Sequence, residues 1–173
     1  MNKVLHLFSF NIGWSLCVWA AVAQWPLFSW MVGLGLVIVN IAVQPRRRIA
    51  IGKVLTVIAL GSLMELFNLQ LGLYTFPKDP SWHPPAWLFA FWPVFSLMFI
   101  DFIEGISRKP LWIHFIIGVI GGAGYYCGEW IGLITFREPK MISLALFSTI
   151  WAIEYILLMK ATVAVGKFSF LQD

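Results

Sequence analysis

Long apolar runs separated by short polar breaks dominate the pattern of this chain. A helix that crosses about 30 Å of hydrocarbon needs roughly 20 apolar residues. Six runs meet or approach that length, namely residues 5–23, 27–43, 54–73, 86–106, 111–133 and 141–159. The pattern predicts an all-α fold, a polytopic transmembrane bundle of six helices. Residues 1–160 would form one bundle and residues 161–173 a short cytoplasmic tail.

The breaks between these runs contain residues that end helices. Proline removes a backbone donor and clashes with the preceding turn, so it rarely continues a helix. The breaks are Gln24-Trp25-Pro26, Gln44-Pro45 with the three arginines that follow, the segment Pro77 to Pro85 with four prolines, Arg108-Lys109-Pro110, and Arg137-Glu138-Pro139-Lys140. Each break predicts a loop or a tight turn.

The composition agrees with a surface that faces lipid. Hydrophobic residues make up 60% of the 173 residues and charged residues 12%, and the mean hydropathy is +0.83. Soluble domains carry about 25% charged residues. The net charge of +4 comes from short cationic clusters between apolar runs, which is typical of topology signals and argues against nucleic-acid binding.

The distribution of lysine and arginine predicts the orientation. If the N-terminus is cytoplasmic, nine of the twelve cations fall in cytoplasmic segments, and Lys78, Arg137 and Lys140 lie outside. The positive-inside rule therefore predicts that both ends are cytoplasmic. An alternative is that Lys3, the first apolar run and Ala21-Val22-Ala23 form a cleaved signal peptide. Cleavage would leave five helices in the same orientation.

Two shorter features concern packing and internal symmetry. Cys17 and Cys127 lie in apolar runs, and we expect two buried thiols rather than a disulfide or a metal pair. Gly72-Leu73-Tyr74-Thr75-Phe76 and Gly132-Leu133-Ile134-Thr135-Phe136 close the third and fifth runs at an offset of 60 residues. The match indicates that helices 3–4 and 5–6 are parallel copies of one hairpin; coincidence is the alternative.

Acidic residues inside the apolar runs are the main candidates for function. A charge at the bilayer centre costs about 3 kcal/mol or more, so such residues usually face the bundle interior. Five of the eight acids lie in predicted spans: Glu65, Asp101, Glu104, Glu129 and Glu154. We consider Glu65, Glu129, Asp101 and Glu154 as candidate catalytic residues. For Glu104, an ion pair with Arg108 one turn later is the simpler interpretation.

Helical spacing groups several of these acids with small and polar residues. The third run places Gly61, Glu65, Asn68 and Gly72 on one face; the fifth places His114, Gly118, Gly121, Tyr125, Glu129 and Gly132 on one face, beside a stripe of Gly124, Gly128 and Gly132. These faces should pack inward. Matching depth predicts that Glu65 lies beside Glu129 and Asp101 beside Glu154. Candidate ligand-binding residues are Glu65, Asn68, Tyr125 and Glu129; pure packing is the alternative.

Several enzyme classes lack their motifs here. Three scattered histidines, including His83 in the proline-rich loop, cannot form the histidine clusters of membrane di-iron enzymes. The chain also lacks a zinc-protease motif, a glycine-rich nucleotide loop and a nucleophile elbow. We therefore expect no cofactor and no metal. Acid–base chemistry by buried carboxyl groups stays open.

An ordered set of motifs along the chain resembles a known family. The set comprises Phe10-Asn11-Ile12-Gly13-Trp14, Leu71 to Phe76, Pro85-Ala86-Trp87-Leu88 with Phe91-Trp92 and Phe95, and Gly121 to Gly128 followed by Gly132. It resembles the bacterial inner-membrane family catalogued as domain of unknown function 2878. The resemblance implies a multi-pass protein of the bacterial cytoplasmic membrane and assigns no activity. Family members tend to carry Thr and Asn where this chain has Asp101 and Glu104, so roles for these two acids are not inherited.

Three functional hypotheses follow. The first is an accessory protein that holds an apolar ligand, such as an acyl chain or isoprenoid, in the bundle. The second is an intramembrane acid–base enzyme acting on a lipid double bond. The third is a small proton-coupled transporter that uses the same acids. The expected partners are membrane lipids, and other membrane proteins or a second copy of the chain, but not nucleic acid.

Overall fold

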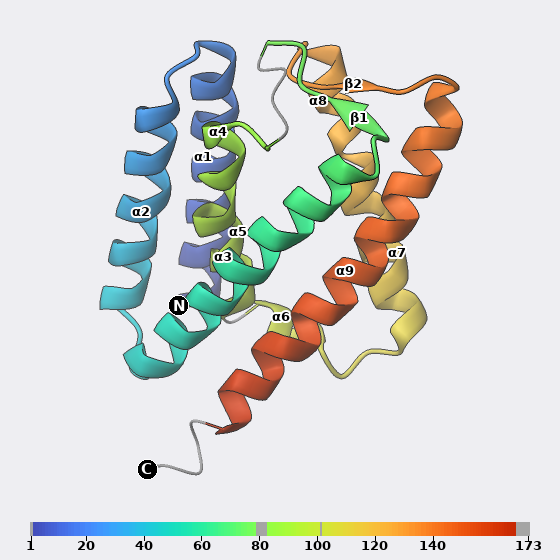
Figure 1. Cartoon of the computed structure of the whole chain (residues 1–173). Helices are drawn as coiled ribbons and strands as arrows, with labels where there is room; N and C mark the ends of the chain where they lie inside the picture. The colour runs from blue at the N-terminus through green and yellow to red at the C-terminus, as the bar shows by residue number, and fades with distance from the viewer. Residues whose placement is uncertain (1, 79–82, 101, 169–173) are drawn as a thin grey trace. The chain divides into compact units, whose positions relative to one another are not determined.

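The computed structural model describes residues 2–78, 83–100 and 102–168, and the regular elements of the described chain are helices and two short strands (Figure 1). In chain order the elements are α1 (Asn2–Val22), α2 (Pro26–Ala42), α3 (Arg47–Gln70), β1 (Tyr74–Thr75), α4 (Ala86–Phe89), α5 (Phe91–Ile100), α6 (Phe102–Ile106), α7 (Leu111–Ala123), α8 (Tyr125–Trp130), β2 (Thr135–Phe136) and α9 (Lys140–Phe168).

Four helical stretches in the described residues are long and apolar enough to cross a membrane. They are Val4–Val22, Arg47–Gln70, Leu111–Trp130 and Lys140–Lys167. Two further apolar helices, Pro26–Ala42 and Ala86–Ile100, are shorter. All six coincide with the predicted runs, so the all-α membrane class is confirmed.

The helix boundaries follow the predicted breaks, with three differences. Within the described residues, single-residue turns separate α4 from α5 at Ala90 and α7 from α8 at Gly124, which keeps helical dihedral angles of φ −59° and ψ −24°. Gly121, Gly122 and Gly124 lower the helix propensity around the turn at Gly124. Helix α9 continues to Phe168, past the predicted end at residue 159. The sequence from Lys160 to Phe168 holds no proline to stop it.

The described chain divides into two compact units. Of the described residues, the first unit comprises 2–62, 86–100, 102–108 and 158–168, and the second comprises 63–78, 83–85 and 109–157. Helices α3 and α9 each contribute residues to both units.

The first unit packs α1 and α2 against α5. Its apolar core includes Cys17, Phe91 and Val94, and the Trp14 and Phe91 rings meet edge to face with centroids 4.1 Å apart. Gly61 leaves room for the indole of Trp92, because a Cβ at Gly61 would lie 2.0 Å from Trp92 Cε3. Tryptophan therefore fills the space beside the predicted glycine face of α3.

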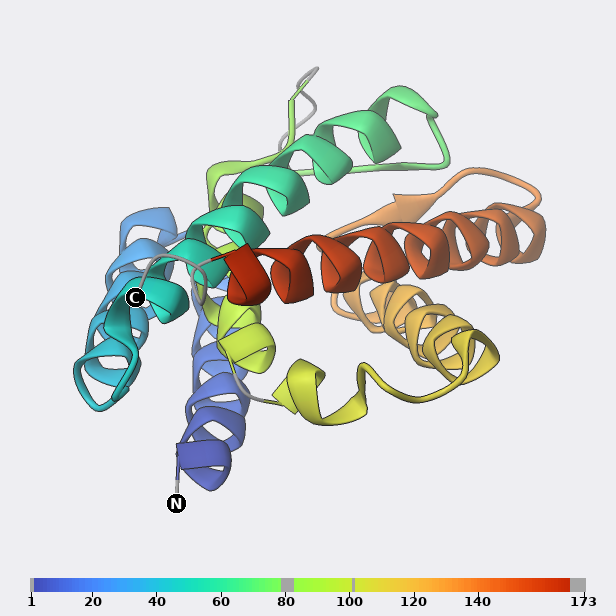
Figure 2. The same cartoon turned by 90° about the horizontal axis from the view of Figure 1, so that it is seen from below.

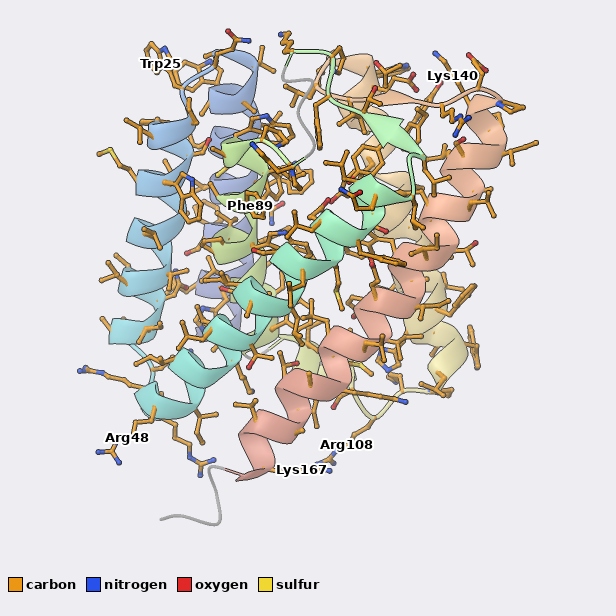
Figure 3. The ribbon with its side chains drawn as sticks, viewed as in Figure 1. Trp25, Arg48, Phe89, Arg108, Lys140 and Lys167 are labelled. Atoms are coloured by element: carbon orange, nitrogen blue, oxygen red, sulfur yellow. The ribbon has the colours of Figure 1, made fainter. Side chains whose placement is uncertain are left out.

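Three cationic side chains and one tryptophan lie at opposite ends of the first unit. Arg48, Arg108 and Lys167 lie at one end of the unit and Trp25 lies at the other (Figure 3). Lys53, which the sequence assigned to the cytoplasmic cations, is buried in α3 and donates to the carbonyl oxygen of Ile100 at 2.9 Å.

The second unit holds α7 against the first part of α9 (Figures 1 and 2). The helices approach closely because glycine faces small residues. A Cβ at Gly118 would lie 2.4 Å from the Ala152 Cα, and one at Gly122 would lie 2.6 Å from the Ser148 Cα.

These contacts correct the predicted stripe of Gly124, Gly128 and Gly132. Gly124 lies at the helix break, and Gly132 follows the end of α8. A Cβ at Gly128 would meet a flexible side chain, that of Ile134, at 3.2 Å. The residues that allow close packing of helix backbones are Gly118 and Gly122.

The two copies of the short motif adopt related conformations and pair with each other. Gly72 and Gly132 have φ values of +64° and +72°, which glycine adopts without the steric cost of a Cβ. The strands that follow are antiparallel, with Tyr74 opposite Phe136 and Thr75 opposite Thr135. Equivalent threonines therefore face each other across this two-stranded sheet.

Candidate functional site

Two buried carboxyl groups of the second unit form the centre of the candidate site. Glu65 and Asn68 lie one turn apart near the end of α3, and each is 1% exposed. Glu154 comes from α9 and is also buried. The predicted face of α3 thus does point inward, and it meets residues from β1, α8 and α9.

Glu65 is held by two tyrosine hydroxyl groups. Tyr74 donates a hydrogen bond to Glu65 Oε2 at 2.9 Å, and Tyr125 donates to Glu65 Oε1. Burial, with the nearby Glu65 carboxyl group, raises the pKa of Tyr74 well above its ordinary value of 10. The Tyr74 hydroxyl therefore stays protonated and keeps its donor role over the physiological pH range.

Glu154 is joined to the same cluster through Asn68. The Asn68 side-chain Nδ2 donates to Glu154 Oε2 at 2.8 Å. Glu65 and Glu154 interact electrostatically with each other, and both interact with Tyr74 and Tyr125. Two carboxyl groups so placed influence each other's protonation.

Aromatic rings enclose this cluster. The Phe147 ring lies 5.2 Å from that of Tyr74 and 4.7 Å from that of Tyr125, centroid to centroid. Trp151 hydrogen-bonds the Tyr125 hydroxyl. A Cβ at Gly121 would lie 2.6 Å from Trp151 Cζ3, so the absence of a side chain at Gly121 leaves room for the indole that supports Tyr125.

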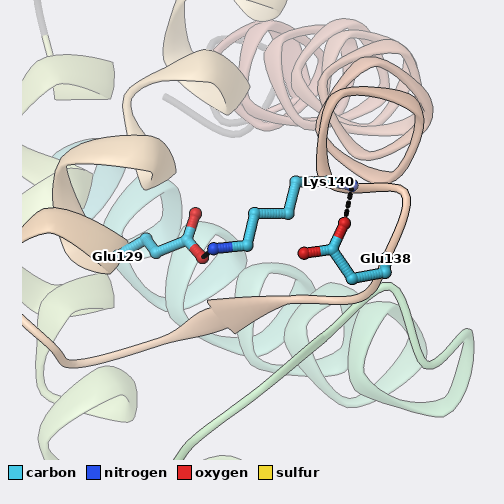
Figure 4. A network of polar contacts seen from close by, with 3 residues as sticks. All are labelled: Glu129, Glu138 and Lys140. Carbon is cyan, nitrogen blue, oxygen red and sulfur yellow. Dashed lines mark hydrogen bonds and ion pairs between the residues drawn. The ribbon is translucent and has the colours of Figure 1, made fainter.

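Glu129 belongs to a different contact. Its Oε1 lies 2.9 Å from Lys140 Nζ, and the backbone N–H of Lys140 donates to Glu138 Oε2 (Figure 4). The predicted pairing of Glu65 with Glu129 is therefore wrong. Depth along the helices was an insufficient guide, because an exposed lysine at the start of α9 reaches the Glu129 carboxylate.

The remaining acids and two histidines lie apart from this cluster or outside the described residues. Asp101 lies outside the described residues, as does the side chain of Glu104, so their predicted partners are not described. His114 is fully buried in α7, with Nε2 3.2 Å from the carbonyl oxygen of Lys109. His83 is exposed, and its Nδ1 lies 3.0 Å from the Pro84 carbonyl oxygen.

The two cysteines were predicted to be buried thiols, and this holds for Cys17 but not for Cys127. Both are free thiols, Cys17 is buried and Cys127 is exposed. The expected burial of Cys127 is wrong, because α8 turns that side chain away from the packed face of the unit. Among the described residues, there is no group of three or more His, Cys, Asp or Glu side chains that could hold a metal ion.

Sequence reasoning missed a second polar cluster, in the first unit. His6 and Asn40 are buried, with His6 Nδ1 2.6 Å from Asn40 Oδ1. Asn40 also donates to Ser9 Oγ at 3.0 Å, and Gln44 hydrogen-bonds His6 Nε2. The helical spacing of His6 with Ser9 and of Asn40 with Gln44 was the available signal. These bonds tie α1 to α2.

The fold and the apolar helices define an integral membrane protein with buried acids. The chain matches the model of a family described as protein of unknown function (DUF2878) over residues 3–157. It therefore belongs to that family, as its motifs suggested. Comparison with curated proteins and with solved structures gives no match.

Proposed function

We propose that this chain is a small proton-coupled transporter in which Glu65 and Glu154 take up and release the proton. The observation that carries the proposal is the chemistry around these two acids. Their hydrogen-bond partners in the described residues are the neutral side chains of Tyr74, Tyr125 and Asn68. Leaving charged groups unpaired in a membrane interior is costly, so these carboxyl groups are suited to carrying protons.

A glycine-rich helical segment beside the site favours transport over catalysis. In secondary transporters, glycine-interrupted hydrophobic segments at corresponding positions of two repeats point to the binding site. Helix α7 ends at Ala123, and α8 starts at Tyr125, the residue that donates to Glu65. The two motifs that begin at Gly72 and Gly132 supply the two paired strands of the same unit.

The proposal includes six spans in a bacterial cytoplasmic membrane, with both ends inside. The arginine and lysine end of the first unit supports this orientation, since Arg48, Arg108 and Lys167 gather there and Trp25 lies at the opposite end (Figure 3). Parallel copies of one hairpin, formed by helices 3–4 and 5–6, are part of the same proposal.

Two rival functions make different use of the same interior. The hypothesis of an acyl chain or isoprenoid held in the bundle started from glycine-lined faces. Trp92, Trp151 and Ala152 occupy the space beside Gly61, Gly121 and Gly118, so those glycines serve packing. A lipid-modifying enzyme would also use Glu65 and Glu154, but it would not require the glycine-rich helical segment that precedes Tyr125.

Charge movement after a pH jump tests the proposal. The protein would be reconstituted in liposomes on a solid-supported electrode, and the transient current would be recorded. We expect a current that is reduced about tenfold by Glu65→Gln or Glu154→Gln, because glutamine cannot take up the proton.

Glu129→Gln is the matched control, since Glu129 is paired with Lys140 outside the cluster. Its current should equal that of the unchanged protein. Currents of equal size in all four proteins would refute proton handling by Glu65 and Glu154. A changed lipid profile in a deletion strain together with those equal currents would favour the enzyme.

A further inference from the structure

One buried oxygen atom of the cluster has no partner among the described residues. Asn68 is 1% exposed, and its Oδ1 accepts no hydrogen bond there. The same amide donates through Nδ2 to Glu154 Oε2, which holds the group beside the carboxylate. An unsatisfied buried acceptor costs about 1–3 kcal/mol, so a ligand that supplies positive charge or a donor would stabilise it.

Two carboxyl groups and the C-terminal end of a helix, which all favour positive charge, lie near this oxygen atom. Glu65 lies one turn earlier on α3, and Glu154 touches the Asn68 amide. Asn68 lies in the last turn of α3, where the helix dipole adds partial negative charge and favours cations. No lysine or arginine is bonded to Glu65 or Glu154 within residues 2–78, 83–100 and 102–168.

The type and number of these oxygen atoms indicate the kind of ligand. Carboxylate and amide oxygens are hard ligands that suit hard cations. Calcium takes six to eight oxygen ligands, and magnesium keeps several waters in a near-ideal octahedron. Both Glu65 oxygen atoms accept from tyrosine hydroxyl groups, so this buried cluster leaves few free oxygen atoms for either ion. In secondary transporters, backbone carbonyl oxygens and the C-terminal ends of helices coordinate sodium ions or protons, and Asn68 lies at such a helix end.

The geometry points to a binding site for one alkali cation, with Asn68 Oδ1 and the Glu154 carboxylate as ligands and Glu65 as the second negative charge. The inference rests on the proposed function, because the cation and the proton would use the same two acids. It adds the chemical class of a second ligand and predicts that sodium and protons compete.

Binding of radioactive sodium to the purified chain in detergent tests the inference. We expect saturable binding that weakens as the pH is lowered, since protonation removes the charge of Glu154. Asn68→Leu removes the amide at similar volume, and Glu154→Gln removes the carboxylate. Each change should weaken affinity about tenfold or more, a loss of about 1.4 kcal/mol.

Asn11→Leu is the control for removing an asparagine side chain. Asn11 is exposed and donates to the Leu7 carbonyl oxygen of its own helix, so sodium binding should not change. If Asn68→Leu fails to fold, Asn68→Asp serves in its place. Asn68→Asp keeps an oxygen atom at the site and should retain binding that Glu154→Gln loses.

Two outcomes would overturn the cation site. One is the absence of saturable sodium binding in the unchanged protein, and the other is equal binding in all variants. If either outcome occurs and the currents after a pH jump still depend on Glu65 and Glu154, the cation site is refuted and proton coupling is not. Sodium binding that depends on Asn68 and Glu154, without such currents, would refute proton coupling instead.

Discussion

At the scale of single residues, Glu65 illustrates how a carboxyl group is accommodated in an apolar chain. Tyr74 and Tyr125 donate to its two oxygen atoms from different elements. The packing of Trp151 and Phe147 in turn fixes Tyr125. Removal of any of these groups should change the protonation of Glu65 as well as the stability of the second unit.

The raised pKa of Tyr74 predicts how stability changes at alkaline pH. The unfolded chain releases the Tyr74 proton near pH 10, whereas burial and Glu65 keep it bound in the folded chain. The unfolded state then binds fewer protons, so stability falls as pH rises through this range, by up to about 1.4 kcal/mol per pH unit.

Tyr74→Phe should make the denaturation midpoint less sensitive to pH above 10, measured by chemical unfolding in detergent. Tyr126→Phe is the control, because Tyr126 is exposed. The same alkaline loss in the unchanged protein and in Tyr74→Phe would contradict this assignment.

Part of the site could be predicted from residues alone. Helical spacing placed Glu65 with Asn68, and the cost of burying charge singled out Glu65 and Glu154. Tyr74 escaped notice because it lies beyond the end of α3, in a strand whose partner is β2. The error over Glu129 has a similar origin, since its partner Lys140 follows a loop and another strand. Contacts across loops leave no periodic signal.

At the scale of elements, the apolar runs predicted the helices well because lipid requires long uninterrupted apolar segments. The exceptions are interruptions within the fourth and fifth runs. Hydropathy does not reveal these turns, since neither Ala90 nor Gly124 adds charge. The face used for packing was also predicted only in part, because small residues occur on several sides of α7.

The contact of α7 with α9 gives a prediction at this scale. Gly118→Ala would force a Cβ to within 2.4 Å of the Ala152 backbone, and overpacking of this kind costs about 1–3 kcal/mol. Thermal unfolding in detergent should show a lower midpoint and less folded protein.

Gly35→Ala is the matched control on α2. A Cβ there has nothing within 4 Å, and alanine is the better helix former by about 1 kcal/mol. Its midpoint should be unchanged or higher. Equal midpoints for the two variants would show that α7 and α9 do not approach at Gly118.

At the scale of the whole molecule, the cation distribution sets the expected topology. Cysteine placed at Arg48 or at Trp25, in a background without Cys17 and Cys127, should react with a membrane-impermeant reagent from opposite sides. Arg48 lies at the cationic end of the first unit and Trp25 at the other end (Figure 3). Periplasmic labelling at Arg48 would contradict the cytoplasmic placement of this end.

Difference infrared spectroscopy across pH tests the central claim, that Glu65 and Glu154 exchange protons, most directly. The protein would be studied in lipid, with the carboxyl stretch as the readout. Glu65→Gln and Glu154→Gln should each remove a pH-dependent carboxyl band and shift the band that remains, since the two groups interact. Glu129→Gln should leave both bands in place. Spectra from Glu65→Gln and Glu154→Gln that match the unchanged protein across pH would contradict the account.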